Sequence, residues 1–441
     1  MGYRADSGAA IVLDVKNGGV LALASYPSYD PNMFQKGLTV QQAKDLFSES
    51  TGVPALNRAI QGAYAPASTF KALSVVAATK AGYNMNNRYN CPASVKVGNR
   101  EFNNFEVKSQ GVINMEQAIA ISCDTIWYQI AYDEWVRDGG LTPKSSVHDY
   151  FFANAKGFGV GKKTGIDLPD EVTGRLPDRQ WKKNYWNANK DFFCNYQARA
   201  SKKDLTPYLI AIAKENCTDG YIVRAGDAVN FSIGQGDTLV SPIQMATIYA
   251  AIANGGTLYK PEIARAFVTA KGKVTKEFQP EVIGKTPQTA EETAFLHRAL
   301  RAVVTRGTAA GVFAGFPIAV SGKTGTGQVL GRNANGSAKD DTSWFSSFAP
   351  SDNPQYAVVM VVSQGGFGAS VSAVGVKDIY TTIFGVKGNT AHPELAVFPS
   401  SGPTRTLPTL DIKNAQEYKE PKLDRKSTRL NSSHLGISYA V

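Results

Sequence analysis

Short apolar runs near both ends of the chain predict β-strands. Residues 9–13 and 20–24 are apolar and flank an Asn-Gly-Gly turn at residues 17–19, which is typical of a β-hairpin. Three later runs are rich in aromatic and β-branched residues and are separated by glycine or proline turns. These later runs are residues 317–320, 343–348 and 356–362. Both ends of the folded region are therefore expected to contribute strands to a sheet.

The middle of the chain has the patterns of helices. Ser241 followed by Pro242 is a helix start, and the run behind it stays apolar as far as Ile252. Residues 291–304 have the spacing of an amphipathic helix that ends near Gly307. Strands at both ends with helices between them predict an α+β fold, with one sheet built from both chain ends and a mostly helical lobe inserted.

The two termini differ from the region between them. We expect residues 1–400 to form one domain and residues 401–441 to form a polar tail without periodicity. Residues 426–441 begin with a stretch that resembles translated sequencing-adapter read-through, and we expect them to be non-native. The chain also begins almost directly on a strand, so we expect that an N-terminal portion is missing. No run reaches the roughly 20 apolar residues that a membrane span requires.

Composition excludes some classes of protein. The 441 residues are 43% hydrophobic and 19% charged, which is ordinary for a folded protein and excludes global disorder. The net charge of +10 favours anionic partners, such as a membrane surface, an acidic polymer or nucleic acid, without selecting among them. The four histidines stand alone in the sequence. A metal enzyme and a Ser-His-Asp hydrolase therefore receive little support.

Two features of the region around residue 200 leave alternatives open. The four cysteines are too few and too scattered for a zinc site or a disulfide scaffold. Cys194 and Cys217 would pair in an exported protein, and otherwise they are free, partly buried thiols.

Residues 179–203 interleave aromatic with basic residues, a composition that can bind nucleic acid by stacking and phosphate contact. The alternative, which we favour, is a surface loop whose aromatic side chains pack onto the lobe.

Ser68 and Lys71 open an otherwise apolar segment that runs to Ala78. Pro66 ends the preceding extended segment and Gly82 closes the run, so we predict a buried helix with Ser68 at its N-terminus. Residues three apart share a helix face, and the lysine can then reach the serine hydroxyl. A lysine in a low-dielectric cleft becomes a usable base, which a serine nucleophile requires. The alternative to a catalytic pair is a serine that only caps the helix, beside a lysine whose ammonium reaches water. Ser-x-x-Lys is common by chance, so this motif alone does not decide between the two.

Two further polar segments strengthen the catalytic interpretation. Ser122 and Asp124 lie two residues apart at a break after the helix-like residues 115–120. Later, a lysine, a glycine and two threonines on a strand can bind a substrate carboxylate while the ligand lies against the backbone. A phosphate-loop interpretation of residues 322–324 fails, because it requires glycine where Pro317 stands and a helix afterwards. The residues of the strand are Lys323, Thr324, Gly325 and Thr326.

Ser-x-x-Lys, then Ser-x-Asp, then Lys-Thr-Gly-Thr is the order found in serine β-lactamases and penicillin-binding proteins. The chain resembles the transpeptidase domain of penicillin-binding proteins from about Gly8 to about Gly385. Ser-Cys-Asp at residues 122–124, together with residues 175–182, is similar to the elongation type of class B, penicillin-binding protein 2, and the division type remains open. Further similar stretches are residues 13–32, 57–59, 234–237, 241–246 and 307–309.

The resemblance implies the fold of serine β-lactamases and penicillin-binding transpeptidases, with an antiparallel sheet. It implies a peptidoglycan D,D-transpeptidase that works through a serine acyl-enzyme and is inhibited by β-lactams. Ser68 would attack the stem peptide after losing its proton to Lys71, and Ser122 would pass a proton to the leaving D-alanine. The backbone N–H groups of Ser68 and Thr326 would bind the oxyanion. The catalytic residues implied are Ser68, Lys71, Ser122, Asp124 and Lys323, and the substrate-binding residues are Thr324, Gly325 and Thr326.

Other properties follow from the resemblance alone. It implies no cofactor, no metal and no nucleic acid, with stem peptides and β-lactams as ligands and a membrane-bound glycan-polymerising partner. It places the catalytic domain outside the cytoplasm, at the cell membrane, with an anchor and a non-catalytic module that this chain lacks. A serine β-lactamase and a penicillin-sensing binding domain of the same fold are alternatives. Two departures stand out, namely Ala67 in place of the usual glycine and a long segment at residues 184–222.

Overall fold

The computed structural model describes residues 4–35, 37–201, 205–269, 273–329, 331–333 and 335–398. The tail predicted at residues 401–441 lies outside the described residues, so the domain boundary near residue 400 stays a prediction. The described residues belong to two compact units. One is a small hairpin within residues 265–278, with strands β8 (Ala266–Val268) and β9 (Val274–Glu277). All other described residues belong to the larger unit.

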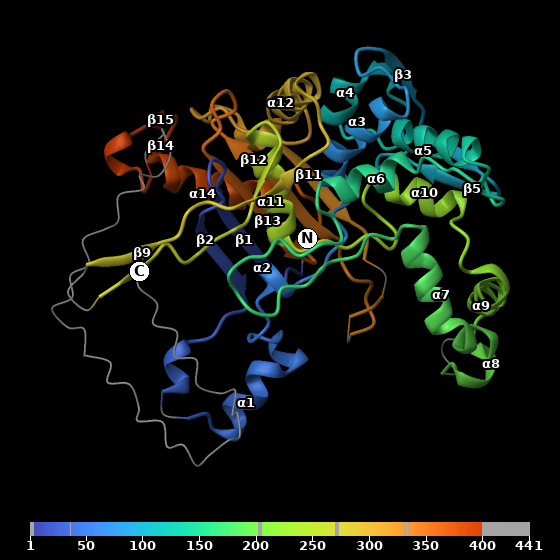
Figure 1. The fold of residues 1–441 in the computed structure, drawn as a ribbon, viewed down its shortest axis with the longest axis horizontal. Coiled ribbons are helices and arrows are strands. Elements are labelled where there is room, and N and C mark those ends of the chain that lie inside the picture. The colour runs from blue at the N-terminus through green and yellow to red at the C-terminus, as the bar shows by residue number, and fades with distance from the viewer. Residues whose placement is uncertain are drawn as a thin grey trace. The chain divides into compact units, whose positions relative to one another are not determined.

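The centre of the larger unit is one five-stranded antiparallel sheet in the order β11-β12-β13-β1-β2 (Figure 1). Strands from the start of the chain therefore lie beside strands from its end, and Ile11 of β1 pairs with Val359 of β13. This confirms the prediction of a sheet built from both chain ends. The strands are β1 (Ser7–Asp14), β2 (Val20–Tyr26), β11 (Ser321–Gly327), β12 (Thr342–Ala349) and β13 (Tyr356–Ser363).

One predicted strand is wrong. Residues 317–320 are not a strand, and β11 begins only at Ser321. The register explains why, because Ser321 pairs with Phe348 and the partner strand ends one residue later. Pro350 follows there and has no N–H group with which to continue the ladder. The apolar character of residues 317–320 thus reflects packing rather than strand pairing.

Helices and the loop before Ser68 cover opposite faces of β12. Ser347 contacts Tyr380 of α14 (Ser372–Phe384), with the two hydroxyl oxygens 3.1 Å apart. Trp344 instead donates from Nε1 to the carbonyl of Ala65 at 3.0 Å. Since odd and even residues of a strand point to opposite faces, α14 lies on one face and the segment before Ser68 lies on the other. The site is therefore built against a fully buried strand.

The two helices predicted in detail are confirmed. Ser241 caps α11 (Pro242–Ala253) in a reciprocal capping box with Gln244, and every residue of this helix is buried. Helix α12 (Ala290–Arg306) matches the predicted amphipathic helix and is capped by Thr289. The α+β fold class predicted from the sequence is confirmed.

The remaining elements form the inserted lobe and its surroundings. None of the helices that the structure describes has both the length and the apolar character needed to cross a membrane. The lobe contains β3 (Arg88–Cys91), β4 (Ser94–Val97), β5 (Arg100–Asn103), β6 (Gly111–Asn114), α4 (Met115–Ala120), α5 (Thr125–Arg137), α6 (Tyr150–Gly157), α7 (Arg179–Cys194), α8 (Tyr196–Arg199), α9 (Pro207–Asp219) and α10 (Ala225–Ser232). Elsewhere lie η1 (Pro31–Phe34), α1 (Val40–Phe47), η2 (Glu49–Thr51), α2 (Arg58–Gln61), η3 (Ala67–Phe70), α3 (Lys71–Lys80), β7 (Thr257–Tyr259), β10 (Val282–Lys285), α13 (Ala310–Phe313), β14 (Val386–Lys387), β15 (Thr390–Ala391) and η5 (Pro393–Leu395).

The aromatic and basic segment at residues 179–203 is helical over α7 and α8, so the predicted surface loop is wrong. Its aromatic side chains do pack, but against a neighbouring helix. Trp186 donates from Nε1 to the carbonyl of Asn216 in α9 at 2.7 Å, and a disulfide joins Cys194 to Cys217. Figure 1 shows α7, α8 and α9 together at one edge of the lobe. Nucleic-acid binding by this segment stays an untested alternative.

Candidate active site

Ser68 lies in the short 3₁₀ turn η3, and Lys71 is the first residue of α3. This agrees with the predicted position of the serine at a helix start. Ala67, just before it, has a φ of +50°, a left-handed conformation that costs a non-glycine residue roughly 1–2 kcal/mol. Its N–H donates to the carbonyl of Gly234 at 2.9 Å, which holds the turn in place. The glycine expected from the family resemblance would adopt this conformation without strain.

Lys71 is completely buried and its ammonium is fully occupied. Nζ donates to Asp124 Oδ1 at 2.6 Å, to the carbonyl of Ser122 at 2.8 Å and to Ser122 Oγ at 3.1 Å. An ammonium has three protons to donate, and these three acceptors use them all. The predicted contact between Lys71 and the Ser68 hydroxyl is therefore not formed, and among the described residues no hydrogen bond reaches Ser68 Oγ.

Ser122 lies between the two lysines of the site. Its Oγ accepts from Lys71 Nζ at 3.1 Å and from Lys323 Nζ at 2.9 Å. Lys323 is also completely buried, and its Nζ donates to the carbonyl of Thr324 at 3.1 Å. Ser122 has a φ of +61°, so its backbone is strained at the point where its hydroxyl meets both amines.

Burial controls the charge of both lysines. Desolvation lowers the pKa of Lys71, and the Asp124 carboxylate partly opposes this by favouring the ammonium. Burial also lowers the pKa of Lys323 well below its ordinary value, and the positive charge of Lys71 lowers it further. Of the two amines, Lys71 has the carboxylate partner within hydrogen-bond distance. The Asp124 carboxylate therefore favours the ammonium form of Lys71 more directly than that of Lys323.

Strand β11 lies directly against the Ser68 turn because residue 325 is glycine. A Cβ built at Gly325 would lie 3.0 Å from Thr69 Cγ2 and 3.1 Å from the carbonyl of Pro66. Few real Cβ atoms approach their neighbours this closely, so a side chain here would push the strand away from the turn. The glycine thus brings the lysine-threonine strand and the serine turn together.

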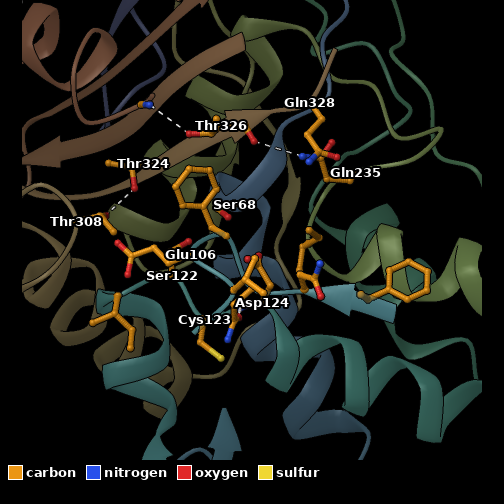
Figure 2. A pocket seen from close by; sticks show the side chains of 18 of the residues that line it. Ser68, Glu106, Ser122, Cys123, Asp124, Gln235, Thr308, Thr324, Thr326 and Gln328 are labelled. Carbon is orange, nitrogen blue, oxygen red and sulfur yellow. Dashed lines mark hydrogen bonds between the residues drawn. The ribbon is translucent and has the colours of Figure 1, made fainter. Parts of the chain in front are cut away.

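Residues from three other segments contact the two threonines of β11, two at their hydroxyl groups and one at a backbone carbonyl. Thr324 Oγ1 is 2.6 Å from Thr308 Oγ1, and Thr326 Oγ1 accepts from the N–H of Gly368 at 3.3 Å. The carbonyl of Thr326 accepts from Gln235 Nε2 at 3.3 Å. These contacts orient both threonines at the cavity wall (Figure 2).

A cavity of about 780 Å³ lies above these groups. Ser68, Ser122, Asp124, Thr324 and Thr326 all line it, and Figure 2 shows their side chains gathered around one hollow. The two lysines lie beneath the lining. The structure therefore brings together the three sequence motifs around one cavity, and Ser68 lines it.

The similarity to known proteins decides the family. A family model described as the penicillin binding protein transpeptidase domain matches residues 8–381. The chain belongs to this family. The family assignment made from the three motifs is thereby confirmed, as is the fold that the resemblance implied.

Relatives of this transpeptidase domain include penicillin-binding protein 2. The peptidoglycan D,D-transpeptidase MrdA of Escherichia coli strain K12 is 31% identical over 385 residues, which are 83% of this chain and 52% of the relative. The chain thus spans about half the length of the curated relatives it matches. The crystal structure of Pseudomonas aeruginosa PBP2 in complex with WCK 5153 has a TM-score of 0.68 and 27% identity, covering 90% of this chain and 74% of that one. A chain in a peptidoglycan synthase complex that coordinates polymerization and crosslinking has a TM-score of 0.67 and 29% identity. The match covers 87% of this chain and 57% of that one. The predicted resemblance to penicillin-binding protein 2 is confirmed.

The transpeptidase domain also contains site residues that the sequence interpretation missed. Gln235 and Thr308 lie in stretches noted as similar to the family, but no role was predicted for them. Asn104 and Phe105 lie in a segment that gave no signal at all. The Phe105 ring packs edge-to-face against the Phe367 ring, with centroids 4.8 Å apart, and both residues line the cavity. Contacts of this kind join distant segments, and no local pattern predicts them.

All four cysteines of the transpeptidase domain form disulfides. Pairing of Cys194 with Cys217 was one of two alternatives, and the structure selects it. The bond between Cys91 and Cys123 was not anticipated, because the two residues are 32 positions apart and show no motif. Cys123 lies between Ser122 and Asp124, so this disulfide reaches the Ser-x-Asp motif itself.

Proposed function

We propose that the chain is the catalytic part of a class B penicillin-binding protein of the elongation type, a peptidoglycan D,D-transpeptidase that β-lactams inhibit. The observation that carries the proposal is the Ser122 hydroxyl, which bonds to both buried lysines and opens onto the cavity that contains Ser68. Such a hydroxyl can move a proton between an amine and a departing group. Relatives named D,D-transpeptidase support the same activity.

In the first half-reaction, Ser68 Oγ attacks the carbonyl of the penultimate D-alanine of a stem peptide. Lys71 in its neutral form takes the Ser68 proton, since a serine needs a base to become a nucleophile. The negative charge on the carbonyl oxygen is bound by the backbone N–H groups of Ser68 and Thr326. The C–N bond then breaks, and Ser122 passes the proton from Lys71 to the leaving D-alanine.

The terminal carboxylate of the donor peptide fits the wall formed by β11. The hydroxyls of Thr324 and Thr326 line the cavity, while Gly325 leaves the backbone open to the ligand. Lys323 lies beneath them and acts through the Ser122 hydroxyl rather than by direct contact with the cavity. A β-lactam has the same acyl and carboxylate groups, so it would acylate Ser68 in the same orientation.

In the second half-reaction, an amine from a neighbouring peptide strand attacks the acyl-enzyme and releases Ser68. The amine loses a proton, which passes through Ser122 to Lys71 and from Lys71 to Ser68 Oγ as the bond between the acyl carbon and Ser68 Oγ breaks, and the new amide bond forms the cross-link. We propose that the full-length protein works at the cell membrane, outside the cytoplasm, beside a glycan-polymerising partner. The similarity to a chain in a peptidoglycan synthase complex supports this partner.

A cross-linking assay tests the proposal. The protein is incubated with a donor stem peptide ending in D-Ala-D-Ala and a second stem peptide that offers an amine, and products are identified by mass spectrometry. One D-alanine should be released for each cross-linked dimer formed, and a β-lactam should stop both. Rapid turnover of penicillin without any dimer would support the β-lactamase alternative. Stable acylation by penicillin without any dimer would support a penicillin-sensing domain.

Replacing Asp124 with asparagine should move the pH dependence of acylation. The carboxylate raises the pKa of Lys71 against the larger effect of burial, so its removal lowers that pKa further. Because the neutral amine is the base, the rising part of the rate profile should shift to lower pH. The acylation rate is measured by stopped flow with a fluorescent penicillin across the range in which both proteins are folded.

The matched control is Asp133→Asn, which removes an exposed carboxylate from the same helix and should leave the profile unchanged. A profile for Asp124→Asn that stays in place or shifts to higher pH would contradict the role of Asp124.

A further inference from the structure

The N-terminus of α5 is capped by a residue from another segment. Asp124 occupies the N-cap position of this helix, but its own side chain makes no capping bond because its carboxylate binds Lys71. Asn104 supplies the missing acceptor, since its Oδ1 accepts from the N–H of Asp124 at 2.8 Å and from the N–H of Thr125 at 3.2 Å. A capping role taken over by a second residue leaves the first free for a different task.

The other end of the Asn104 side chain is fixed as well. Nδ2 donates to the carbonyl of Pro92 at 2.7 Å, to the carbonyl of Lys108 at 3.3 Å and to Cys91 Sγ at 3.3 Å, and Asn104 is only 6% exposed. Lys108 belongs to the loop that forms one wall of the cavity. A single buried amide therefore ties the Ser-x-Asp turn to three points of the neighbouring hairpin segment.

A covalent bond reinforces the same connection. Cys123 is joined by a disulfide to Cys91, the last residue of β3. Thr125 adds a hydrogen bond from Oγ1 to the carbonyl of Pro92 at 2.9 Å. The strained residue Ser122, with its φ of +61°, is thus followed by three successive residues that are anchored to residues 91–104. Strained backbone persists only where its surroundings hold it, and these contacts meet that requirement.

We propose that Asn104 is a positioning residue for acyl transfer, and that with the Cys91–Cys123 disulfide it holds the Ser122 hydroxyl and the Asp124 carboxylate against Lys71. Without Asn104, two buried N–H groups lose their acceptor. The Asp124 carboxylate can then turn to cap its own helix, which would take it away from Lys71. This inference rests on the proposed function, because acylation of Ser68 is the reaction that it concerns.

The test compares Asn104→Ala with Asn254→Ala. Asn254 makes an equivalent set of bonds, because its Oδ1 accepts from the N–H groups of Gly256 and Thr257 while its Nδ2 donates to two carbonyls. It lies at the end of α11 and does not line the cavity. The pair therefore separates the loss of a buried, multiply hydrogen-bonded asparagine from the loss of Asn104 in particular.

Acylation by a chromogenic cephalosporin is measured as two constants, the apparent dissociation constant of the non-covalent complex and the rate constant of acylation. Asn104→Ala should lower the acylation rate constant about tenfold or more, with the dissociation constant within about threefold of wild type. Asn254→Ala should leave both constants within about threefold while it lowers the melting temperature. Equal acylation rate constants in the two variants would overturn the proposal.

Two double cysteine variants, each lacking one disulfide, test the positioning of Ser122 independently if Asn104→Ala does not fold. The double variant Cys91→Ser/Cys123→Ser should also slow acylation, whereas Cys194→Ser/Cys217→Ser, which removes the distant disulfide, should not. Equal acylation rate constants in these two double variants would overturn the role of the Cys91–Cys123 bond. Failure of the wild-type protein to react with the cephalosporin would instead overturn the proposed function, so the two outcomes are distinct.

Discussion

Replacing Ser68 with alanine is expected to abolish covalent labelling by penicillin. Ser68 lines the cavity and is the hydroxyl that the proposed mechanism acylates. Intact-mass spectrometry after incubation with a fluorescent penicillin should show the mass of one adduct on the wild-type protein and none on the variant. The acylation rate should fall by at least about a thousandfold.

Ser74→Ala is the matched control for this experiment. Ser74 is a buried serine on α3, the helix that directly follows the Ser68 turn, and its Oγ donates to the carbonyl of Ser232 at 2.5 Å. The control protein should keep the full adduct mass even if its stability falls by about 1 kcal/mol. An adduct that survives in Ser68→Ala would show that another residue is the nucleophile.

Replacing Lys71 with methionine should have the second largest effect. The change keeps the length of the side chain but removes the proposed base, and the acylation rate should fall by about a hundredfold to ten-thousandfold. It also leaves the Asp124 carboxylate buried without its partner, which should lower the free energy of unfolding by about 3–5 kcal/mol. Stopped-flow acylation and urea unfolding measure the two effects separately.

A double variant separates catalysis from stability at Lys71. Lys71→Met combined with Asp124→Asn removes the unpaired charge and should recover much of the lost stability, but none of the lost acylation rate. Lys80→Met, at the exposed end of the same helix, should change neither quantity by a measurable amount. Normal acylation by Lys71→Met would show that a different group is the base.

Local sequence patterns predicted the fold well where an element is marked by its own turn residues, capping residue or apolar spacing. The hairpin at the start of the chain and the helix capped by Ser241 follow directly from turn, cap and apolar patterns. Residues 317–320 show where such patterns fail, because their apolar character does not reveal that the partner strand ends at Ala349. The helical state of residues 179–194 was missed for a related reason, since the segment has no buried residue and packs mainly within its own part of the lobe.

The site could be predicted as a set of residues but not as a geometry. Short motifs identified the serines and lysines, because nucleophiles, bases and anion-binding groups are rare residue types in apolar segments. The three bonds from Lys71 to Ser122 and Asp124 could not be predicted, because they depend on the distance between helices that are about 50 residues apart in sequence. Asn104 and the Cys91–Cys123 disulfide have no sequence motif at all, since only the folded hairpin brings them to the turn.

A crystal structure of the protein after reaction with a β-lactam tests the central claim most directly. The account predicts a covalent bond from Ser68 Oγ to the opened β-lactam carbonyl, with that carbonyl oxygen between the N–H groups of Ser68 and Thr326. It also predicts the antibiotic carboxylate at the hydroxyls of Thr324 and Thr326. Density for the adduct on any other residue, or a carboxylate that points away from β11 into solvent, would contradict the account.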